Sequence, residues 1–329
     1  MFPEKVVVIT GGTAGVGRAS AQAFAEAGYA VAVIGRSEQG VNSTIEELRL
    51  LGARASGAAV DVSDGAALLA AGRKIESELG PISIWVNAAT LTVLAPVTDI
   101  TDEEFQRVTD VTYLGCVHGT RTALTLMAER DRGTIVQVGS ALAYRSVPLQ
   151  AAYCAAKAAI HGFTDSLRSE LIHNKSSIRL TMVHLPGVNT PQFDWSRNKM
   201  GNNVQPVAPI YQPEVAARAI LSAARRAPRE VWLGRSTLQS IVGTMLFPGL
   251  LDRMMAKQGW EGQITDQPEA ADRPDNLLQP VEGLHRSHGR FDNQAEDRAL
   301  HLNMNNPGLA ILGVAAVAWL GLRSLRRRL

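Results

Sequence analysis

A run of apolar residues near the start of the chain leads directly into a cluster of glycines. Residues 5–10 (KVVVIT) are continuously apolar, which is typical of a strand buried on both faces of a parallel sheet. Residues 11–17 (GGTAGVG) follow at once, and a helical pattern then extends from Arg18 to Gly28. In such a strand–turn–helix unit, glycines let the backbone approach a pyrophosphate, whose charge the helix N-terminus stabilises. The segment therefore predicts the start of a dinucleotide-binding fold, with a glycine turn used only for packing as the alternative.

Strand patterns and helical patterns alternate along the rest of the first 234 residues. Such alternation predicts a parallel sheet with right-handed crossovers. The predicted fold class is α/β, a doubly wound, Rossmann-type sheet of seven parallel strands with helices on both faces. A capping box, Thr101 with Glu104, is expected to open a long helix toward Met127. The seven strands are expected at residues 5–10, 29–34, 53–60, 82–86, 133–138, 178–184 and 230–233.

Ser140, Tyr153 and Lys157 form the candidate catalytic group. Tyr153 and Lys157 are four residues apart in an alanine-rich helical run, so they share one face of the helix. A phenol with an ordinary pKa of about 10 is a poor acid or base at neutral pH, but a neighbouring ammonium favours the phenolate and lowers that pKa. Ser140 follows an apolar strand and can present its hydroxyl to a substrate oxygen. A surface tyrosine beside a solvated lysine is the alternative interpretation.

The end of the second predicted strand bears on the choice of cofactor. An enzyme that prefers NAD would carry a carboxylate there to hold the ribose 2′-hydroxyl. This chain has Arg36 followed by Ser37, and the planar guanidinium suits a 2′-phosphate. NADP(H) is therefore predicted over NAD(H), with an exposed arginine at a strand end as the alternative.

Short segments after the third and fourth predicted strands lie where cofactor contacts gather in an open α/β sheet. Taken singly, each is equally compatible with a plain turn. Together with the glycine turn and the second strand, these segments supply the candidate cofactor-binding residues Gly11, Thr13, Gly15, Val16, Gly17, Arg36, Ser37, Asp61, Val62, Asn87 and Ala88.

These motifs in combination resemble the short-chain dehydrogenase/reductase family over about residues 5–234. The resemblance rests on TGGTAGVG at 10–17, Asp61-Val62, Asn87-Ala88, Ser140, Tyr153-x-x-x-Lys157 and PGVNT at 186–190. It implies that Tyr153 is the general acid/base, that Lys157 binds the nicotinamide ribose and lowers the pKa of Tyr153, and that Ser140 orients the substrate oxygen. It also implies nicotinamide contacts from Pro186, Gly187, Val188 and Thr190.

Two positions depart from the family pattern. The family's Asn-Ala-Gly is Asn87-Ala88-Ala89 here, so a glycine that allows tight backbone passage is lost. The helix position that usually holds a proton-relay asparagine is Thr112, which offers one hydroxyl in place of an amide. The expectation is a relay through Thr112 and water, or else slower turnover.

Composition and charge narrow the functional classes. The formal net charge of +2 does not indicate the strongly basic surface that is typical of a nucleic-acid-binding protein. The seven histidines show no ligand spacing, so no metal site is predicted, and the two cysteines, Cys116 and Cys154, are expected to be reduced thiols. Because a strand pattern begins at Lys5, no signal peptide is expected, and the body of the enzyme is predicted to be cytoplasmic.

The chain is expected to divide into a catalytic domain, residues 1–234, and three appended segments. Residues 235–260 carry an apolar stripe at helical spacing, which predicts a helical extension packed over the body, a flap at the substrate mouth, or a surface that dips into lipid. Residues 261–306 are polar and predict a linker or disorder. Within the catalytic domain, residues 191–213 are rich in Pro, Asn and Gly with interspersed aromatics, which favours an apolar lid.

Residues 307–329 combine about fifteen uncharged residues with a basic end. The apolar stretch is short of the roughly 20 residues that span a bilayer. A shallow membrane anchor with its arginines at anionic headgroups is predicted, and a single-pass tail anchor is the alternative.

The predicted function is an NADP(H)-dependent oxidoreductase acting on a carbonyl or secondary alcohol of a small lipophilic substrate, attached to membrane lipid through residues 307–329. A membrane-bound nucleotide-binding scaffold with little turnover is the alternative, suggested by Ala89 and Thr112. Family members often form dimers or tetramers, so the resemblance allows a homo-oligomer.

Overall fold

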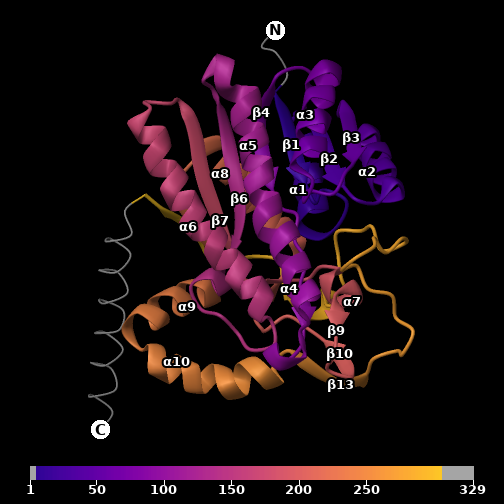
Figure 1. Ribbon diagram of the computed structural model, residues 1–329, viewed down its shortest axis with the longest axis vertical. Coiled ribbons are helices and arrows are strands. Elements are labelled where there is room, and N and C mark those ends of the chain that lie inside the picture. Colours follow the sequence, from indigo (N-terminus) through magenta and orange to yellow (C-terminus); the bar gives the residue numbers. More distant parts are fainter. Residues whose placement is uncertain (1–4, 306–329) are drawn as a thin grey trace.

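The computed structural model describes residues 5–305, which are built around one eight-stranded sheet (Figure 1). The strand order is β15-β12-β7-β6-β4-β1-β2-β3. All neighbouring pairs are parallel except β12 and β15, which are antiparallel. The strands are β1 (Val6–Thr10), β2 (Ala30–Gly35), β3 (Ala55–Ala59), β4 (Ile82–Asn87), β6 (Gly133–Ser140), β7 (Ile178–Leu185), β12 (Glu230–Leu233) and β15 (His301–Met304).

The Rossmann-type fold is confirmed, but the predicted number of strands is wrong. The seven expected strands are present, and β15 adds an eighth at the edge of the sheet. Its sequence, HLNM, lacks an apolar run because an edge strand joins a sheet through backbone hydrogen bonds to β12. Hydrophobic patterning therefore gave no signal for this strand.

Helices cover both faces of the sheet, and the alternation of side chains along the strands assigns each face its core. Val7 and Ile9 of β1 pack with α1 (Gly15–Glu26), α2 (Glu38–Leu50) and α8 (Pro213–Arg226). Val6 and Val8 pack on the opposite face with α3 (Gly65–Leu79), α5 (Gly115–Met127) and α6 (Ala151–His173). The carboxyl ends of the parallel strands thus open between two helical layers.

The expected long helix over 101–127 is interrupted in the structure. Its capping box is present: the Glu104 amide donates to Thr101 Oγ1 at 3.2 Å, and the Thr101 amide donates to Glu104 Oε2 at 2.9 Å. Helix α4 (Asp102–Val108) then passes through one π-helical turn, Thr109–Leu114, before α5 begins.

The predicted lid segment, residues 191–213, is a set of short elements. Helix α7 (Gln192–Trp195) is followed by three short strands, each paired with a distant segment. The pairs are β9 (Arg197–Asn198) with β5 (Val93–Leu94), β10 (Asn202–Val204) with β13 (Ile264–Pro268), and β11 (Ile210–Tyr211) with both β8 (Gly187–Val188) and β14 (Ala295–Glu296).

The segment after the catalytic domain begins with helix α9 (Arg235–Leu246), helix α10 (Pro248–Met254) and a π-helical turn, Met255–Gly259. Ile241 and Val242 of α9 are buried against Trp232 and Met304. In Figure 1, α9 and α10 lie below the carboxyl-terminal end of the sheet. Among residues 5–305, no helix combines the length and apolar character needed to cross a bilayer.

The polar segment 261–306 is not a linker over its described part, which corrects the sequence-based expectation. It supplies β13, β14 and β15, and residues 274–289, called here the strap, lie across the glycine-turn end of the sheet. Leu277 of the strap is fully buried in the core. Its polar composition misled the prediction because arginines of the body hold the strap by its backbone carbonyls. The predicted membrane-associating tail, residues 307–329, lies outside the described residues.

Candidate active site

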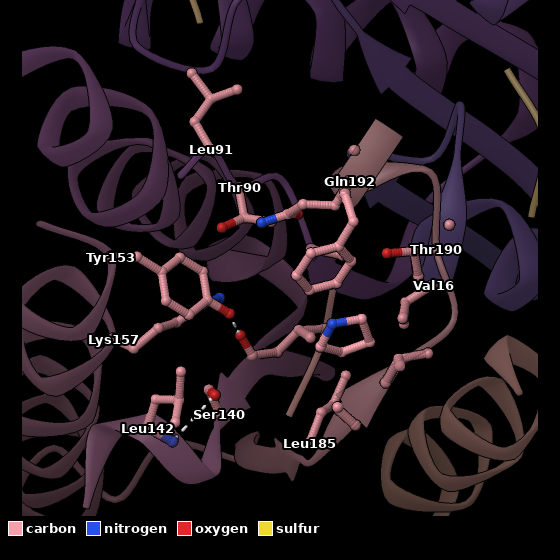
Figure 2. A pocket seen from close by; sticks show the side chains of 18 of the residues that line it. Val16, Thr90, Leu91, Ser140, Leu142, Tyr153, Lys157, Leu185, Thr190 and Gln192 are labelled. Atoms are coloured by element: carbon pink, nitrogen blue, oxygen red, sulfur yellow. Dashed lines mark hydrogen bonds between the residues drawn. The ribbon is translucent and has the colours of Figure 1, made fainter. Parts of the chain in front are cut away.

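A cavity of about 550 Å³ runs along the carboxyl ends of the parallel strands. It begins at the glycine turn between β1 and α1, passes Ser140, Tyr153 and Lys157, and ends against α9 and α10. In Figure 2, Tyr153 and Lys157 lie on one side of this space, and Val16 and Thr190 lie on the other. The predicted site residues that line it are Gly11, Thr13, Gly15, Val16, Gly17, Arg36, Ser37, Asp61, Val62, Ala88, Ser140, Tyr153, Lys157, Pro186, Gly187, Val188 and Thr190.

The glycine turn is packed too closely to hold side chains. A Cβ added at Gly17 would lie 2.1 Å from the carbonyl oxygen of Gly11. A Cβ at Gly11, whose φ is +70°, would lie 2.7 Å from Cα of Ala89. The turn therefore accommodates Ala89 with glycine at position 11, and the backbone beside the cavity stays bare, as the approach of a pyrophosphate requires.

Tyr153 and Lys157 lie one turn apart on α6, as their spacing predicts. The Lys157 ammonium is buried, donates to the Val138 carbonyl at 2.8 Å, and lies 5.5 Å from the centroid of the Tyr153 ring. Burial lowers the pKa of Lys157 to about 8, so this side chain still carries its charge at neutral pH.

The pKa of Tyr153 shifts against the sequence-based expectation. Burial raises this pKa and outweighs the opposing effect of a hydrogen bond from the Ser140 hydroxyl. The phenol is therefore held in its protonated form at neutral pH. A protonated phenol is the form that can give a proton to a carbonyl oxygen.

Ser140 ends β6 with its hydroxyl directed at the cavity. Its Oγ accepts a hydrogen bond from the Leu142 amide at 3.1 Å, which fixes the rotamer at the start of the next turn (Figure 2). Its carbonyl oxygen lies 3.2 Å from Nδ1 of the buried His184. The serine is thus held from two sides.

Two predicted site residues do not reach the cavity formed by residues 5–305. The buried amide of Asn87 accepts from Trp85 Nε1 at 2.9 Å and donates to Thr120 and Gln137. The Thr112 hydroxyl accepts from the Leu91 amide at 3.0 Å and donates to the Leu91 carbonyl at 3.1 Å. Both side chains form hydrogen bonds within the protein next to the cavity. Composition and residue spacing cannot distinguish this structural role from a direct contact with the cofactor.

Arg36 lies at the end of β2 as predicted, and its guanidinium is held by the strap. Its Nη1 donates to the carbonyls of Leu277 and Leu278 at 3.3 and 3.2 Å, and its Nη2 donates to the carbonyl of Asn276. The neighbouring Ser37 hydroxyl donates to the Glu282 carboxylate at 2.6 Å. The Arg36 guanidinium and the Glu282 carboxylate therefore both lie at the glycine-turn end of the cavity.

Further strap contacts tie the last quarter of the chain to the glycine turn. The Gly15 amide donates to the Arg286 carbonyl at 2.9 Å, and Arg18 Nη1 donates to the His285 carbonyl at 2.6 Å. Arg107 donates to the Leu277 carbonyl at 3.1 Å and forms an ion pair with Asp61. Although burial opposes the shift, hydrogen bonds from Arg107 and Ser63 lower the pKa of Asp61.

The opposite end of the cavity combines apolar and polar side chains from segments that motif analysis did not assign to the site. α10 and the π-helical turn after it contribute Leu251, Met254, Met255 and Gln258, and α9 contributes Ser236, Gln239 and Ser240. Phe193 and Trp195 of α7 also line the cavity, and Trp195 packs against His285 of the strap. The apolar stripe over 235–260 and the aromatics over 191–213 were the available signals. Other lining residues that the sequence did not identify are Leu142, Arg145, Val147, Gln150, Pro206, Val207, Pro209, Asn276, Pro280, Val281 and His285.

The Tyr153 phenol and the glycine turn open onto one cavity, an arrangement that fits an oxidoreductase of the dinucleotide-binding kind. Comparison with known families agrees. A family model described as short chain dehydrogenase matches residues 5–201, which is more than half of the chain. The protein belongs to this family, whose members act on CH–OH groups.

Individual relatives extend the match beyond the family model. The chain is 30% identical over 286 residues to the oxidoreductase YxnA of Bacillus subtilis, covering 86% of this chain and 80% of that protein. Among solved structures, an actinorhodin polyketide ketoreductase variant with NADPH is 30% identical, with a TM-score of 0.55, over 57% of this chain and 72% of that chain. A short-chain dehydrogenase of Mycobacterium paratuberculosis bound to NAD shares the fold, with 24% identity, a TM-score of 0.61 and coverage of 68% and 92%.

Proposed function

We propose that this protein is an NADP(H)-dependent reductase of a lipophilic carbonyl compound, with Tyr153 as the proton donor. The observation that carries the proposal is that Ser140, Tyr153 and Lys157 converge on one wall of a cavity whose other end is the glycine turn. The glycines of that turn leave its backbone without side chains beside the cavity, which suits the approach of a dinucleotide pyrophosphate.

The protein's own groups divide the work of the proposed reaction. A bound nicotinamide cofactor would supply the hydride. Tyr153 gives its proton to the carbonyl oxygen, and Ser140 holds that oxygen by a hydrogen bond. The Lys157 ammonium, buried behind the ring, stabilises the negative charge that Tyr153 acquires when its proton leaves. This stabilisation opposes the effect of burial, which raises the pKa of Tyr153 and by itself makes the phenol a weaker acid.

The apolar wall formed by α10 supports a lipophilic substrate. Leu251, Met254 and Met255 face the cavity, and methionines adapt to irregular apolar ligands. The purified full chain with NADPH should reduce members of a panel of apolar ketones and aldehydes and should favour longer chains over short polar analogues. Tight NADPH binding without reduction of any panel member, together with recovery of a stable protein partner, would support the scaffold alternative instead.

Arg36 is proposed to set the preference for NADP(H). Hydrogen bonds to a charged group contribute about 1.5–3 kcal/mol, so Arg36→Ala should raise the KM for NADPH by about tenfold or more and change that for NADH far less. Glu282 opposes this preference, because its carboxylate would repel a 2′-phosphate. Glu282→Gln should therefore lower the KM for NADPH.

Steady-state kinetics with both cofactors measures these effects, and Arg36→Lys is the matched control that keeps the charge without the fork. Equal increases in both KM values for Arg36→Ala would mean that Arg36 only anchors the strap. In that case the proposed cofactor preference would be wrong while the proposed reduction chemistry would stand.

Membrane attachment through residues 307–329 is also part of the proposal, and the face of α9 and α10 supports it. Four apolar residues there are each more than half exposed: Met245, Leu246, Phe247 and Leu250. They lie on the elements that also line the apolar end of the cavity. This arrangement would let a lipid-dissolved substrate enter from the membrane surface.

Deletion of residues 307–329 should greatly reduce co-sedimentation with vesicles that contain phosphatidylglycerol. The deletion must begin after β15, because residues 301–304 belong to the sheet. Adding Phe247→Glu and Leu250→Glu should abolish the remaining binding, whereas Leu50→Glu, at a leucine that is 89% exposed on α2, is the control. Undiminished binding of the deletion variant would contradict the proposed anchor.

A further inference from the structure

A group of polar side chains lies behind Ser140, between α6 and the strands β7 and β12. His161, His184 and Glu230 each direct one potential ligand atom inward, and these atoms all lie within 4.8 Å of one another. The Tyr144 hydroxyl joins them at 2.9 Å from His161 Nε2 and 2.8 Å from Glu230 Oε2. None of these four residues, called here the His–Glu cluster, lines the cavity. The proposed reduction therefore leaves the cluster without a role.

The sequence did not reveal the cluster because its members are far apart along the chain. His161 follows Lys157 by four residues on α6, so both lie on neighbouring turns of one helix face. His184 near the end of β7 is paired with Trp232 of β12, and Glu230 lies two residues before Trp232 on the same face of the sheet. Only the strand register brings the imidazole and the carboxylate together.

His184 carries the strongest sign that the cluster has a ligand. Its Nδ1 faces the Ser140 carbonyl at 3.2 Å, and a carbonyl only accepts, so Nδ1 carries the proton. In the neutral ring Nε2 then holds a lone pair. This atom is fully buried, has no hydrogen-bond partner within the described protein, and lies 3.3 Å from Glu230 Oε2, which is another acceptor. Two acceptors that face each other in a buried site repel, so either a proton on Nε2 or a metal ion lies between them.

The spacing of the four atoms suits a transition-metal ion. Ligands about 2.0–2.1 Å from a tetrahedral ion are separated from one another by about 3.3 Å. The separations here are 3.3 Å for His184 with Glu230, 3.6 Å for His161 with Glu230, and 2.8 and 2.9 Å from Tyr144 to its two neighbours.

The surroundings also match those of a metal site. Metal-ligating histidines donate their second N–H to a carbonyl or carboxylate, as His184 does to Ser140. Trp232 Nε1 donates to Glu230 Oε2 at 2.9 Å and orients the carboxylate. An apolar group that includes Ile241 and Val242 of α9 closes the site on one side. The nearest cation, Arg229, is 3.9 Å from Glu230 Oε1 and is paired with Asp165.

We propose that the His–Glu cluster binds one divalent transition-metal ion, with zinc as the ion that its two imidazoles, carboxylate and phenol suit best. The site is structural, because all four ligands come from the protein. It joins α6, β7 and β12 to Tyr144, four residues after Ser140, and so holds the segment that presents the catalytic serine.

Metal analysis of the untagged full chain tests this proposal. After incubation with zinc chloride and dialysis, the protein should retain one zinc ion per chain, and cobalt(II) in its place should give the visible absorption of a tetrahedral site. A chelator should lower the Tm of the wild type. His161→Gln, at the more exposed end of the cluster, should retain no zinc and show no chelator effect. His173→Gln, at an exposed position on the same helix, should behave as the wild type.

Two results would overturn the metal site. If the wild type retains no zinc, gives no cobalt absorption and has a Tm unaffected by chelator, a shared proton and not a metal joins His184 to Glu230. If His161→Gln and His173→Gln retain zinc equally, the ion is bound elsewhere. The cobalt spectrum of the wild type decides the first question even where a variant fails to fold.

Discussion

Replacing Tyr153 with phenylalanine is expected to lower kcat for carbonyl reduction by about 10²- to 10⁴-fold, the range that a positioned acid contributes. The ring of the variant keeps the contacts of the tyrosine, so cofactor affinity should change little. The lost hydroxyl is the phenol that the structure places beside Ser140 and Lys157 in the cavity. Single-turnover rates with NADPH and an active ketone from the panel measure the effect.

Tyr113→Phe is the matched control, because Tyr113 lies outside the cavity and packs beside Cys116 and Ile160. The pH profile gives a second check on the same chemistry. Lys157 loses its charge as the pH rises through about 8, so the reduction rate should fall above that value and be flat below it. A Tyr153→Phe variant that reduces ketones at the wild-type rate would remove the phenol from the mechanism.

Leu277→Ala is expected to detach the strap and weaken cofactor binding by at least about tenfold. Truncating a buried leucine costs about 2–5 kcal/mol, and Leu277 is fully buried in the core on one face of the sheet. The substitution should destabilise the strap more than the sheet, because a local segment opens at a lower free energy than the whole fold unfolds. When only a fraction of molecules has the strap in place, the apparent Kd equals the intrinsic Kd divided by that fraction.

Fluorescence titration with NADPH and the rate of tryptic cleavage within the strap measure these two effects. Leu278→Ala is the matched control: the neighbouring side chain is 44% exposed, and its carbonyl contact to Arg36 survives the substitution. If both variants bind NADPH as the wild type does while Leu277→Ala is cleaved faster, the strap is dispensable for the cofactor.

Local sequence signals predicted well which segments line the cavity around Tyr153. The glycine turn and the Tyr153–Lys157 pair depend on spacings of a few residues, which one strand–turn–helix unit and one helix face convert directly into geometry. The seven parallel strands followed from mainly apolar runs, because a strand buried on both faces carries few polar positions.

The features that the sequence did not predict depend on contacts between distant segments. The strap is mostly polar, and arginines hold it by donating hydrogen bonds to its backbone carbonyls. The hydrophobic pattern of the sequence therefore did not predict that this segment packs on the body. Asn87 was predicted to contact the cofactor, but its amide is satisfied by Trp85, Thr120 and Gln137, which neighbouring strands and helices bring to it. The role of such a side chain depends on its hydrogen-bond partners, and the pairing of the strands determines which partners lie close to it.

The strap has a consequence for how the protein is made. β1, α1 and β2 are synthesised well before residues 274–289, which cover their carboxyl ends. A nascent chain that already contains Ser140, Tyr153 and Lys157 still lacks one wall of its nucleotide site. Cofactor capture by this protein should therefore begin only after translation has passed the strap, and a fragment ending at Gly234 should not bind the cofactor as the longer chain does.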